Sequence, residues 1–430
     1  MSLFGTLGIG VTAINANGKA IQVASENISN VNTVGFKRSR VSFGDIVADT
    51  SDTHGLLAAI GFGTKLVDIQ RMHSQGAIMN TSFPLDMAIA GEGFFVLNGE
   101  QVGRPGQTLF SRAGQFRVDK DGFVVNPSGA RLQGQPVGAN DELQSTTADL
   151  AVQRTNIAPR QTTEIALALN LDARTAVRGG LGGPLPFDVN DPDATSDYAT
   201  TVSVFDSLGK PYDARLYFER TSNTTWDAHI LIDGVEVQTQ QFTFQQNGAL
   251  VSNVTTQAGN WNPTPPAAQG VAFNFDAGTT FDAVTGTGGL DGITSFGSAS
   301  TIVTQSQDGY ASGALVSIDL ARDGMLRGNY TNGKSLVLGQ VTLAQFRNPE
   351  GLNRIGENLF EGSLESGDEA IAAPLTGSRG SIIQGSLEAS NVDLAQEFVD
   401  LIQYQRAFQA GSRSVTTGDE LLREVVNLKR

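Results

Sequence analysis

The chain lacks several residue types and patterns on which common protein functions depend. Its 430 residues include no cysteine, so neither disulfides nor cysteine-ligated metals are available. The three histidines, His54, His73 and His229, are scattered, and none stands in a spacing typical of metal ligands. No glycine-rich stretch has the spacing of a nucleotide-binding loop. We therefore expect no enzymatic activity, no cofactor and no metal.

Positive charge and long apolar runs are also scarce. Lysine and arginine number 29 against 44 acidic residues, which gives a net charge of −15. Because nucleic-acid binding draws its affinity from basic side chains, this balance argues against a nucleic-acid partner. No apolar run reaches the roughly 18 residues of a membrane-spanning helix. The first lysine is Lys19, so the start of the chain has no basic region typical of a cleaved secretory signal.

Glycine and alternating segments are abundant in the middle of the chain. Glycine accounts for 50 residues, whereas an average usage of about 7% would give about 30. Residues 94–97, 115–118 and 123–125 read as short strands, and residues 316–320 and 337–343 alternate in the same way. Asn332-Gly333 is a strong hairpin signal. The stretch 146–300 differs in composition, being rich in Thr, Ala, Asn, Gln and Asp, and we interpret it as an inserted β domain.

Both ends of the chain carry apolar residues at alternating spacings of four and three. This spacing predicts a helix with a narrow apolar stripe, which coiled helices bury against a partner. We expect the two helices to pair with each other and to polymerise. The candidate polymerisation interface comprises Leu7, Val11, Ile14, Ile21, Ile28, Leu394, Phe398, Leu401, Phe408, Val415, Leu422 and Val426.

Details of these two helices follow from single residues. Ser390, with Asp393 three positions on, has the spacing of a capping box and predicts a second helix over 391–427. Gly18, Gly411 and Gly418 interrupt the helices, each at a cost of about 1 kcal/mol relative to alanine. We therefore expect helices that are marginal in the free monomer.

The order of segments predicts a mixed, mainly β fold built as a nested multidomain subunit. Its N- and C-terminal α-helices are paired and coiled-coil-like, and two β-rich domains lie between them in the sequence. Residues 1–75 with 376–430 form the terminal helical polymerisation core and an adjoining extended segment. Residues 76–145 with 301–375 form a β-rich middle domain, and 146–300 form the inserted outer β domain.

Two longer motifs connect the ends to a known family. Residues 24–40, ASENISNVNTVGFKRSR, resemble the N-terminal signature of bacterial flagellar rod and hook proteins. Residues 390–402, SNVDLAQEFVDLI, followed by QRAFQA at 405–410, are similar to the matching C-terminal signature. The motif residues singled out are Asn27, Asn30, Asn32, Gly35, Phe36, Asn391 and Asp393. Asn and Gly tolerate left-handed backbone, so several of these residues also suit the end of a helix and a turn.

Further segments favour the hook within this family. The chain is longer than a rod protein is expected to be, and the additional length is the insert. VFDSLGK at 204–210, QDGYASG at 307–313 and the stretch 348–360 resemble segments of hook proteins. The resemblance covers 1–145 and 300–430 well and is thin over most of 146–300.

The resemblance implies a structural subunit of the flagellar hook. Such a subunit polymerises into a flexible tube that acts as a universal joint and transmits motor torque to the filament. The implied location is extracellular, after passage through the flagellar type III export apparatus without a cleaved signal peptide. The implied partners are further copies of the chain, the distal rod, the hook cap and the hook–filament junction protein.

Three alternatives remain open at this stage. A distal rod, or drive-shaft, protein would share the end motifs, and it differs by forming a straight, stiff assembly. An extracellular carbohydrate-active or proteolytic enzyme would need a cleft with convergent titratable groups. A filament-junction or adhesin-like binding protein is the third, and the matched terminal motifs argue against it.

Overall fold

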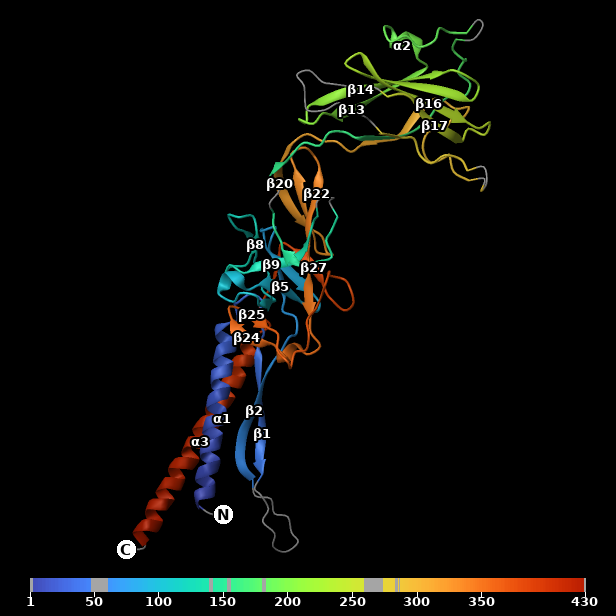
Figure 1. Ribbon diagram of the computed structural model, residues 1–430. Helices are drawn as coiled ribbons and strands as arrows, with labels where there is room; N and C mark the ends of the chain where they lie inside the picture. Colours follow the sequence, from blue (N-terminus) through green and yellow to red (C-terminus); the bar gives the residue numbers. More distant parts are fainter. Residues whose placement is uncertain are drawn as a thin grey trace. The chain divides into compact units, whose positions relative to one another are not determined.

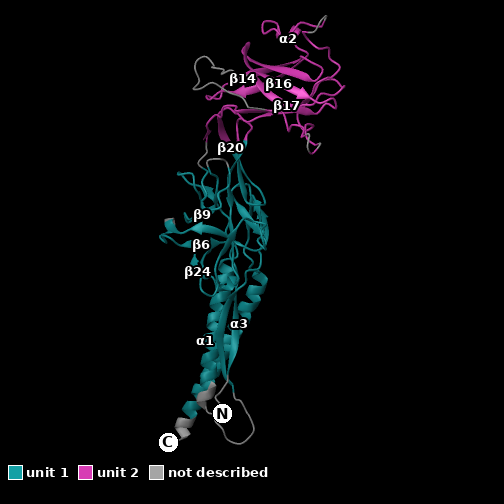
Figure 2. Ribbon diagram, turned by 45° about the vertical axis from the view of Figure 1, so that its right-hand side comes forward, with its two compact units in different colours: residues 1–154, 317–329, 335–430 teal, residues 155–316, 330–334 magenta. Residues whose placement is uncertain are grey.

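The computed structural model divides the chain into two compact units. Unit 1 comprises residues 1–154, 317–329 and 335–430, and unit 2 comprises residues 155–316 and 330–334 (Figure 2). The structure describes residues 3–47, 61–138, 142–152, 156–179, 183–258, 274–282, 285 and 287–428. The expected fold class is confirmed, since the chain is mainly β with a long helix at each end.

The two terminal helices lie side by side in unit 1. Helix α1 spans Leu3–Ser29 and helix α3 spans Leu394–Leu428 (Figure 1). An antiparallel hairpin of β1 (Ser39–Val47) and β2 (Gly61–Arg71) runs beside α1. The hairpin approaches α1 closely at Gly63, where a Cβ atom would lie 2.1 Å from Thr12 Oγ1. The first and last segments of the chain thus form one elongated bundle.

Glycines make the contact between α1 and α3. Gly10, Gly411 and Gly418 are all buried. A Cβ atom on Gly10 would lie 2.7 Å from Val415 Cγ2, and one on Gly411 would lie 3.2 Å from Ile14 Cγ1. Two of the three glycines that we expected to weaken the helices, Gly411 and Gly418, therefore lie in the seam. Their missing side chains let the two backbones approach each other, which the spacing of apolar residues alone does not reveal.

Helix α3 begins later than the capping-box pattern predicts. It starts at Leu394 rather than Asn391, and the capping residue is Asp393 rather than Ser390. The Asp393 carboxylate accepts hydrogen bonds from the backbone N–H groups of Ala395 at 2.9 Å and Gln396 at 3.4 Å. Such bonds satisfy amides that have no partner inside the helix. The helix starts late because the Asn391 side chain is held by other segments, as described below.

The β-rich part of unit 1 contains a sheet in which strands that precede the insert pair with strands that follow it. Strand β9 (Arg131–Pro136) pairs with both β22 (Ser335–Val341) and β5 (Phe94–Asn98). The sheet continues through β6 (Thr108–Ser111) to β25 (Leu359–Glu361). Two short pairs stand apart, β4 (Met87–Ala90) with β27 (Ser381–Gln384) and β3 (Ile78–Asn80) with β28 (Ser386–Glu388).

Shorter elements complete this part of unit 1. They are η1 (Glu100–Val102), β7 (Arg117–Val118), β8 (Val124–Val125), β10 (Ala148–Asp149), β23 (Leu343–Gln345), η2 (Pro349–Gly351), β24 (Asn353–Gly356) and β26 (Ala370–Ala372). Strands β20 (Gly313–Leu320) and β21 (Met325–Tyr330) belong partly to unit 1 and partly to unit 2. A cluster of aromatic and aliphatic side chains fills the interior: Phe94, Val96, Phe110, Ala344, Phe346, Leu352 and Phe360. Strands on both sides of the insert contribute to it, so neither half of the sequence can form this core alone.

Unit 2 contains two sheets around one core. The larger sheet is an antiparallel meander of β13 (Tyr198–Phe205), β14 (Pro211–Arg220), β15 (Thr225–Ile232), β16 (Val235–Phe244) and β17 (Leu250–Ala258). The smaller one places β12 (Glu164–Asn170) between β18 (Asn274–Asp276) and β19 (Thr301–Gln307). Strand β11 (Asn156–Ile157) and the short helix α2 (Pro192–Thr195) complete the unit. Trp226, Phe218 and Phe242, all fully buried, are the largest side chains of its core.

We expect the glycine seam to tolerate no large side chain. Gly10→Leu should destabilise unit 1 by about 1–3 kcal/mol, because the added atoms must separate α1 from α3. Gly8→Leu is the matched control, since a Cβ atom on Gly8 meets nothing within 4 Å. It should stabilise the helix by up to about 1 kcal/mol through helix propensity. Thermal unfolding of the monomer, followed by the helical circular dichroism signal, measures both. Equal effects of the two substitutions would contradict a close-packed seam.

Candidate functional site

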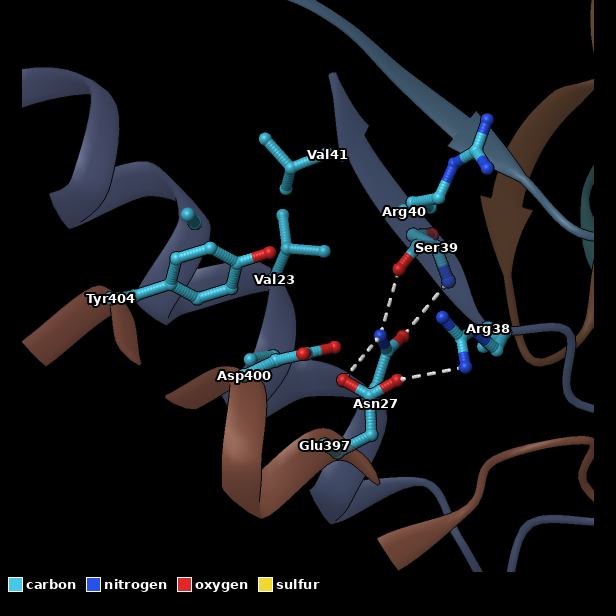
Figure 3. Close-up of a pocket in the computed structure, with 11 residues that line it drawn as sticks. Val23, Asn27, Arg38, Ser39, Arg40, Val41, Glu397, Asp400 and Tyr404 are labelled. Atoms are coloured by element: carbon cyan, nitrogen blue, oxygen red, sulfur yellow. Dashed lines mark hydrogen bonds and ion pairs between the residues drawn. The ribbon is translucent and has the colours of Figure 1, made fainter. Parts of the chain in front are cut away.

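The two terminal motifs meet at one end of the helix pair. The Asn27 side chain is 1% exposed and bridges three elements (Figure 3). Its Nδ2 donates to the backbone oxygen of Ser39 on β1 at 2.8 Å and to Glu397 Oε2 on α3 at 3.1 Å. Its Oδ1 accepts the N–H of Ser39 at 2.9 Å. The amide thus extends the hydrogen bonding of the strand and ties both helices to it.

Asn391, from the C-terminal motif, also connects separate segments through its side-chain amide. Asn391 Oδ1 accepts the backbone N–H of Arg38 at 2.7 Å, and its Nδ2 donates to the backbone oxygen of Met72 at 2.8 Å. The Arg38 guanidinium lies 3.6 Å from Glu397 Oε1, and that carboxylate is 3% exposed (Figure 3). The segment before α3 is therefore fastened to both strands of the hairpin.

The remaining motif residues shape the turn after α1. Gly35 has a φ of 69°, and a Cβ atom there would lie 2.6 Å from the backbone nitrogen of Ala113, so this position requires glycine. Phe36 is buried, with the Arg354 guanidinium 5.5 Å from its ring centre. Asn30 donates to the backbone oxygen of Glu26 at 2.9 Å. Asn32 is exposed in the turn.

A buried ionic cluster lies next to this turn and was not predicted from the sequence. Lys37 Nζ and Glu388 Oε1 are 2.5 Å apart, and both side chains are fully buried. Arg112 lies 3.4 Å from Glu388 Oε2, and the backbone N–H of Gly76 donates to Glu388 Oε1 at 2.8 Å. Glu388 comes from β28, so residues about 350 positions apart in the sequence form the pair. No local pattern marks Glu388, because its role depends on pairing between distant segments.

Burial governs the ionisation of the basic groups around this cluster. Desolvation lowers the pKa of Lys37, although the charge of Glu388 and the hydrogen bond to it act in the opposite direction. Desolvation likewise lowers the pKa of Arg112. The pKa of His73 falls to about 4, first through burial and then through the charges of Arg71, Lys37 and Arg112. His73 is therefore neutral at pH 7 and adds no third positive charge to the cluster.

The cavity between Asn27, Glu397 and Tyr404 is small, with a volume of about 20 Å³, enough for a single water molecule (Figure 3). No group of histidine and acidic side chains within the described ranges could hold a metal ion. Among the described helices, none is long and apolar enough to span a membrane. The hydrogen bonds and ion pairs described above hold the chain ends together.

The structure places the predicted interface residues in different surroundings. Four of them lie against glycines of the opposite helix: Leu7, Ile14, Phe408 and Val415. The exposed ones are Val11, Leu394, Phe398 and Phe408. The half-buried ones are Leu7, Ile14, Ile21, Ile28, Leu401, Val415 and Leu422. The side chain of Val426 lies outside the part that the structure describes. Part of the predicted stripe is thus used within the subunit, and another part remains free.

These features define a class of protein. Paired terminal helices, a β-rich body between them and matched terminal motifs are those of an axial subunit of the bacterial flagellum. Four family models match the chain: flagella basal body rod protein at 7–37, flagellar hook protein FlgE/F/G D1 domain at 88–167, flagellar basal body protein FlaE D2 domain at 170–310, and flagellar basal body rod FlgEFG protein C-terminal at 383–428.

Full-length relatives identify the member of this class. The flagellar hook protein FlgE of Treponema pallidum is 34% identical over 98% of both chains. That of Salmonella typhimurium is 32% identical over 97% of this chain and 98% of its own. The chain belongs to the family of flagellar hook protein FlgE. It shares its fold with the crystal structure of the Helicobacter pylori flagellar hook protein FlgE2, at a TM-score of 0.51 and 13% identity over 72% of this chain and 100% of that one.

The family membership decides between the alternatives left open by the sequence. The relatives are hook proteins, so the chain is a structural subunit of the flagellar hook rather than of the distal rod. The family is a structural one, without a known enzymatic activity.

The buried ionic cluster should contribute strongly to stability. Glu388→Gln leaves the charges of Lys37 and Arg112 buried without a counter-charge, and we expect it to lower the free energy of unfolding by about 3–5 kcal/mol. Glu361→Gln is the control, because Glu361 pairs with Arg104 at 3.5 Å near the surface. Its loss should cost at most about 1 kcal/mol. Chemical unfolding, followed by the helical signal of unit 1, compares the two. Similar losses would show that the cluster has no special role.

Proposed function

We propose that copies of this chain polymerise through the outer faces of their terminal helices into the tube of the hook. In this proposal the helix pair and its hairpin form the permanent contacts of a universal joint that bends while it transmits torque. The junction around Asn27 and Glu388 holds the pair in the geometry that assembly needs. The proposal rests on how little of α3 the isolated subunit covers.

The observation that carries the proposal is the exposed apolar surface of α3. The helix has 35 residues and a length of about 52 Å. Among residues 394–424, whose burial is described, only Glu397, Gly411 and Gly418 are buried. Phe398 and Ile402, one turn apart, are each 49% exposed. A helix with apolar residues on its uncovered face needs a further partner, and large apolar patches on a surface mark interaction sites.

Neighbouring elements extend this surface. Val11 on α1 is 47% exposed. On β2, Phe62, Val67 and Ile69 are 49%, 60% and 45% exposed. Exposed apolar side chains thus occur on α1, α3 and β2, as contacts with several neighbouring copies would require.

The polar groups of the bundle also support the proposal that apolar side chains make the contacts between copies. Asn27, Arg38, Asn391 and Glu397 are engaged within the subunit. We expect the exposed apolar side chains, Phe398 and Ile402 among them, to supply the contacts with neighbouring copies, since their burial is favourable and non-directional. Such contacts tolerate the small changes of angle that a bending tube imposes better than aligned hydrogen bonds do.

The same proposal includes the partners of a hook subunit. We expect contacts with the distal rod at one end of the hook, with the hook–filament junction protein at the other, and with the hook cap during growth. We also expect passage through the flagellar type III export apparatus without a cleaved signal peptide. Secretion of the full chain by cells that lack this apparatus would contradict the expected route.

Removing the exposed apolar pair should weaken assembly strongly without unfolding the subunit. We expect Phe398→Ser with Ile402→Ser to weaken each subunit contact by about 3 kcal/mol, since both side chains lose apolar burial. The minimum concentration for assembly should then rise on the order of a hundredfold. Sedimentation and electron microscopy measure assembly, and circular dichroism measures the monomer.

The matched control for this pair is Gln405→Ser with Gln409→Ser. These residues are also exposed and one turn apart on α3, but they are polar. The control should assemble within a few-fold of the unaltered chain. Normal assembly of the Phe398/Ile402 variant would contradict the proposed interface.

A further inference from the structure

A short loop in unit 1 presents one leucine entirely to solvent. Leu364 is 103% exposed and lies in residues 362–368, between β25 and β26. The loop is held by its own serines. Ser363 Oγ accepts the backbone N–H groups of Glu365 at 3.1 Å and Ser366 at 3.2 Å. Ser366, which is fully buried, accepts the N–H of Ser363 through its Oγ at 2.9 Å.

The loop is also fastened to the body of unit 1. Ser363 Oγ donates to the backbone oxygen of Gly351 in η2. A Cβ atom on Gly351 would lie 2.6 Å from the backbone of Glu365, which shows how closely the two segments pack. Leu364 therefore sits on an ordered loop without contributing to the core. Because the loop backbone is already ordered, only the rotamer freedom of the Leu364 side chain is lost when it binds a partner.

Unit 1 also contains a groove with apolar walls. It has a volume of about 630 Å³, and Phe83, Phe116, Pro127 and Leu387 form its apolar walls. Phe83 is 67% exposed, so the groove is open to solvent. The volume lies within the range of sites that bind small ligands or side chains.

The walls of this groove are held by hydrogen bonds. Thr81 Oγ1 donates to Asp86 Oδ2 at 2.7 Å within the turn that carries Phe83. Gln384 Nε2 donates to the backbone oxygen of Pro84 at 3.0 Å. Leu387 comes from β28, which pairs with β3. The groove is therefore present before any partner binds.

The exposed charges of the loop and of the groove differ in sign. The loop carries Glu365 and Asp368, both exposed, and the exposed Glu369 follows it. The groove holds the exposed Arg117 and the carboxylate of Asp86, which is buried and accepts a hydrogen bond from Thr81. The exposed charge in the groove is therefore positive, and complementary charges of this kind orient partners and exclude wrong ones.

We infer that Leu364 of one copy inserts into the groove between Phe83, Phe116 and Leu387 of a neighbouring copy. The inference rests on the proposed function, because it assigns a second contact to the same polymer. The two surfaces lie on different elements, and Leu364 does not occupy the groove of its own subunit, since it is wholly exposed. A contact between two different surfaces of identical chains is heterologous and generates open helical assemblies. Such a knob-and-groove contact would join the β-rich parts of unit 1, separately from the helices.

Disulfide trapping tests the contact directly, because the chain has no cysteine of its own. Leu364→Cys and Phe83→Cys are made in separate full-length chains, which are mixed, assembled and mildly oxidised. We expect covalent dimers in the assembled mixture and none in either variant alone or in dilute monomers. Leu364→Cys mixed with Leu375→Cys is the control, because Leu375 is 59% exposed and lies outside the groove. Equal trapping in the control mixture would overturn the inference.

Assembly measurements provide a second, independent test. Leu364→Ser should raise the minimum concentration for assembly about tenfold or more and leave monomer unfolding unchanged. Arg117→Glu should raise it several-fold, and Glu365→Arg in the same chain should restore most of the loss. Restoration by the double change separates a contact between these surfaces from general damage.

The outcomes distinguish this inference from the proposed function. Tubes that form normally from Leu364→Ser, or that give no trapping between positions 364 and 83, would overturn the knob-and-groove contact and leave helix-driven assembly standing. Failure of the unaltered chain to assemble under any condition, including with a hook cap present, would overturn both.

Discussion

The meeting of the two chain ends is the contact on which the rest of the structure depends. Lys37 pairs with Glu388, and Asn27 pairs with Glu397, so residues 3–40 and 388–428 form one folded region. Both contacts are buried, and a buried polar group without its partner costs far more than the pair gains. The ends are therefore either joined correctly or strongly destabilised. Unit 2 and most of the β-rich part of unit 1 lie between these two segments in the sequence.

This constraint supports the proposal that assembly uses the outer faces of the helices. The polar groups of the junction are engaged within the subunit, and the glycine seam occupies one face of each helix. What remains on α3 is a face with Phe398 and Ile402 half exposed. The contacts within the subunit combine buried polar pairs with the close-packed seam, whereas the proposed contacts between copies are apolar and tolerant of small changes in angle. In this proposal a hook that bends as it rotates needs both kinds of contact, and they come from different sides of the same helices.

The sequence predicted what local patterns encode. The helix pair follows from the four-and-three spacing, and the β21–β22 hairpin follows from Asn332-Gly333, where Gly333 has a φ of 76°. The seam was only partly predicted, because the pattern counts apolar side chains and the contact is made by buried Gly10, Gly411 and Gly418. Glu388 could not be found from the sequence, since its partner is distant and the exposure of a glutamate is the ordinary expectation. The start of α3 was missed because two residues, Ser390 and Asp393, both suit the cap.

We expect the subunit to polymerise only when its chain ends are joined. Electron microscopy of the concentrated full-length protein, beside a chain lacking residues 391–430, measures this dependence. Curved or polymorphic tubes should form from the full chain and none from the shortened one, with unit 2 folded in both. Tubes from the shortened chain would show the opposite, namely that α3 and its junction with Asn27 are dispensable for assembly.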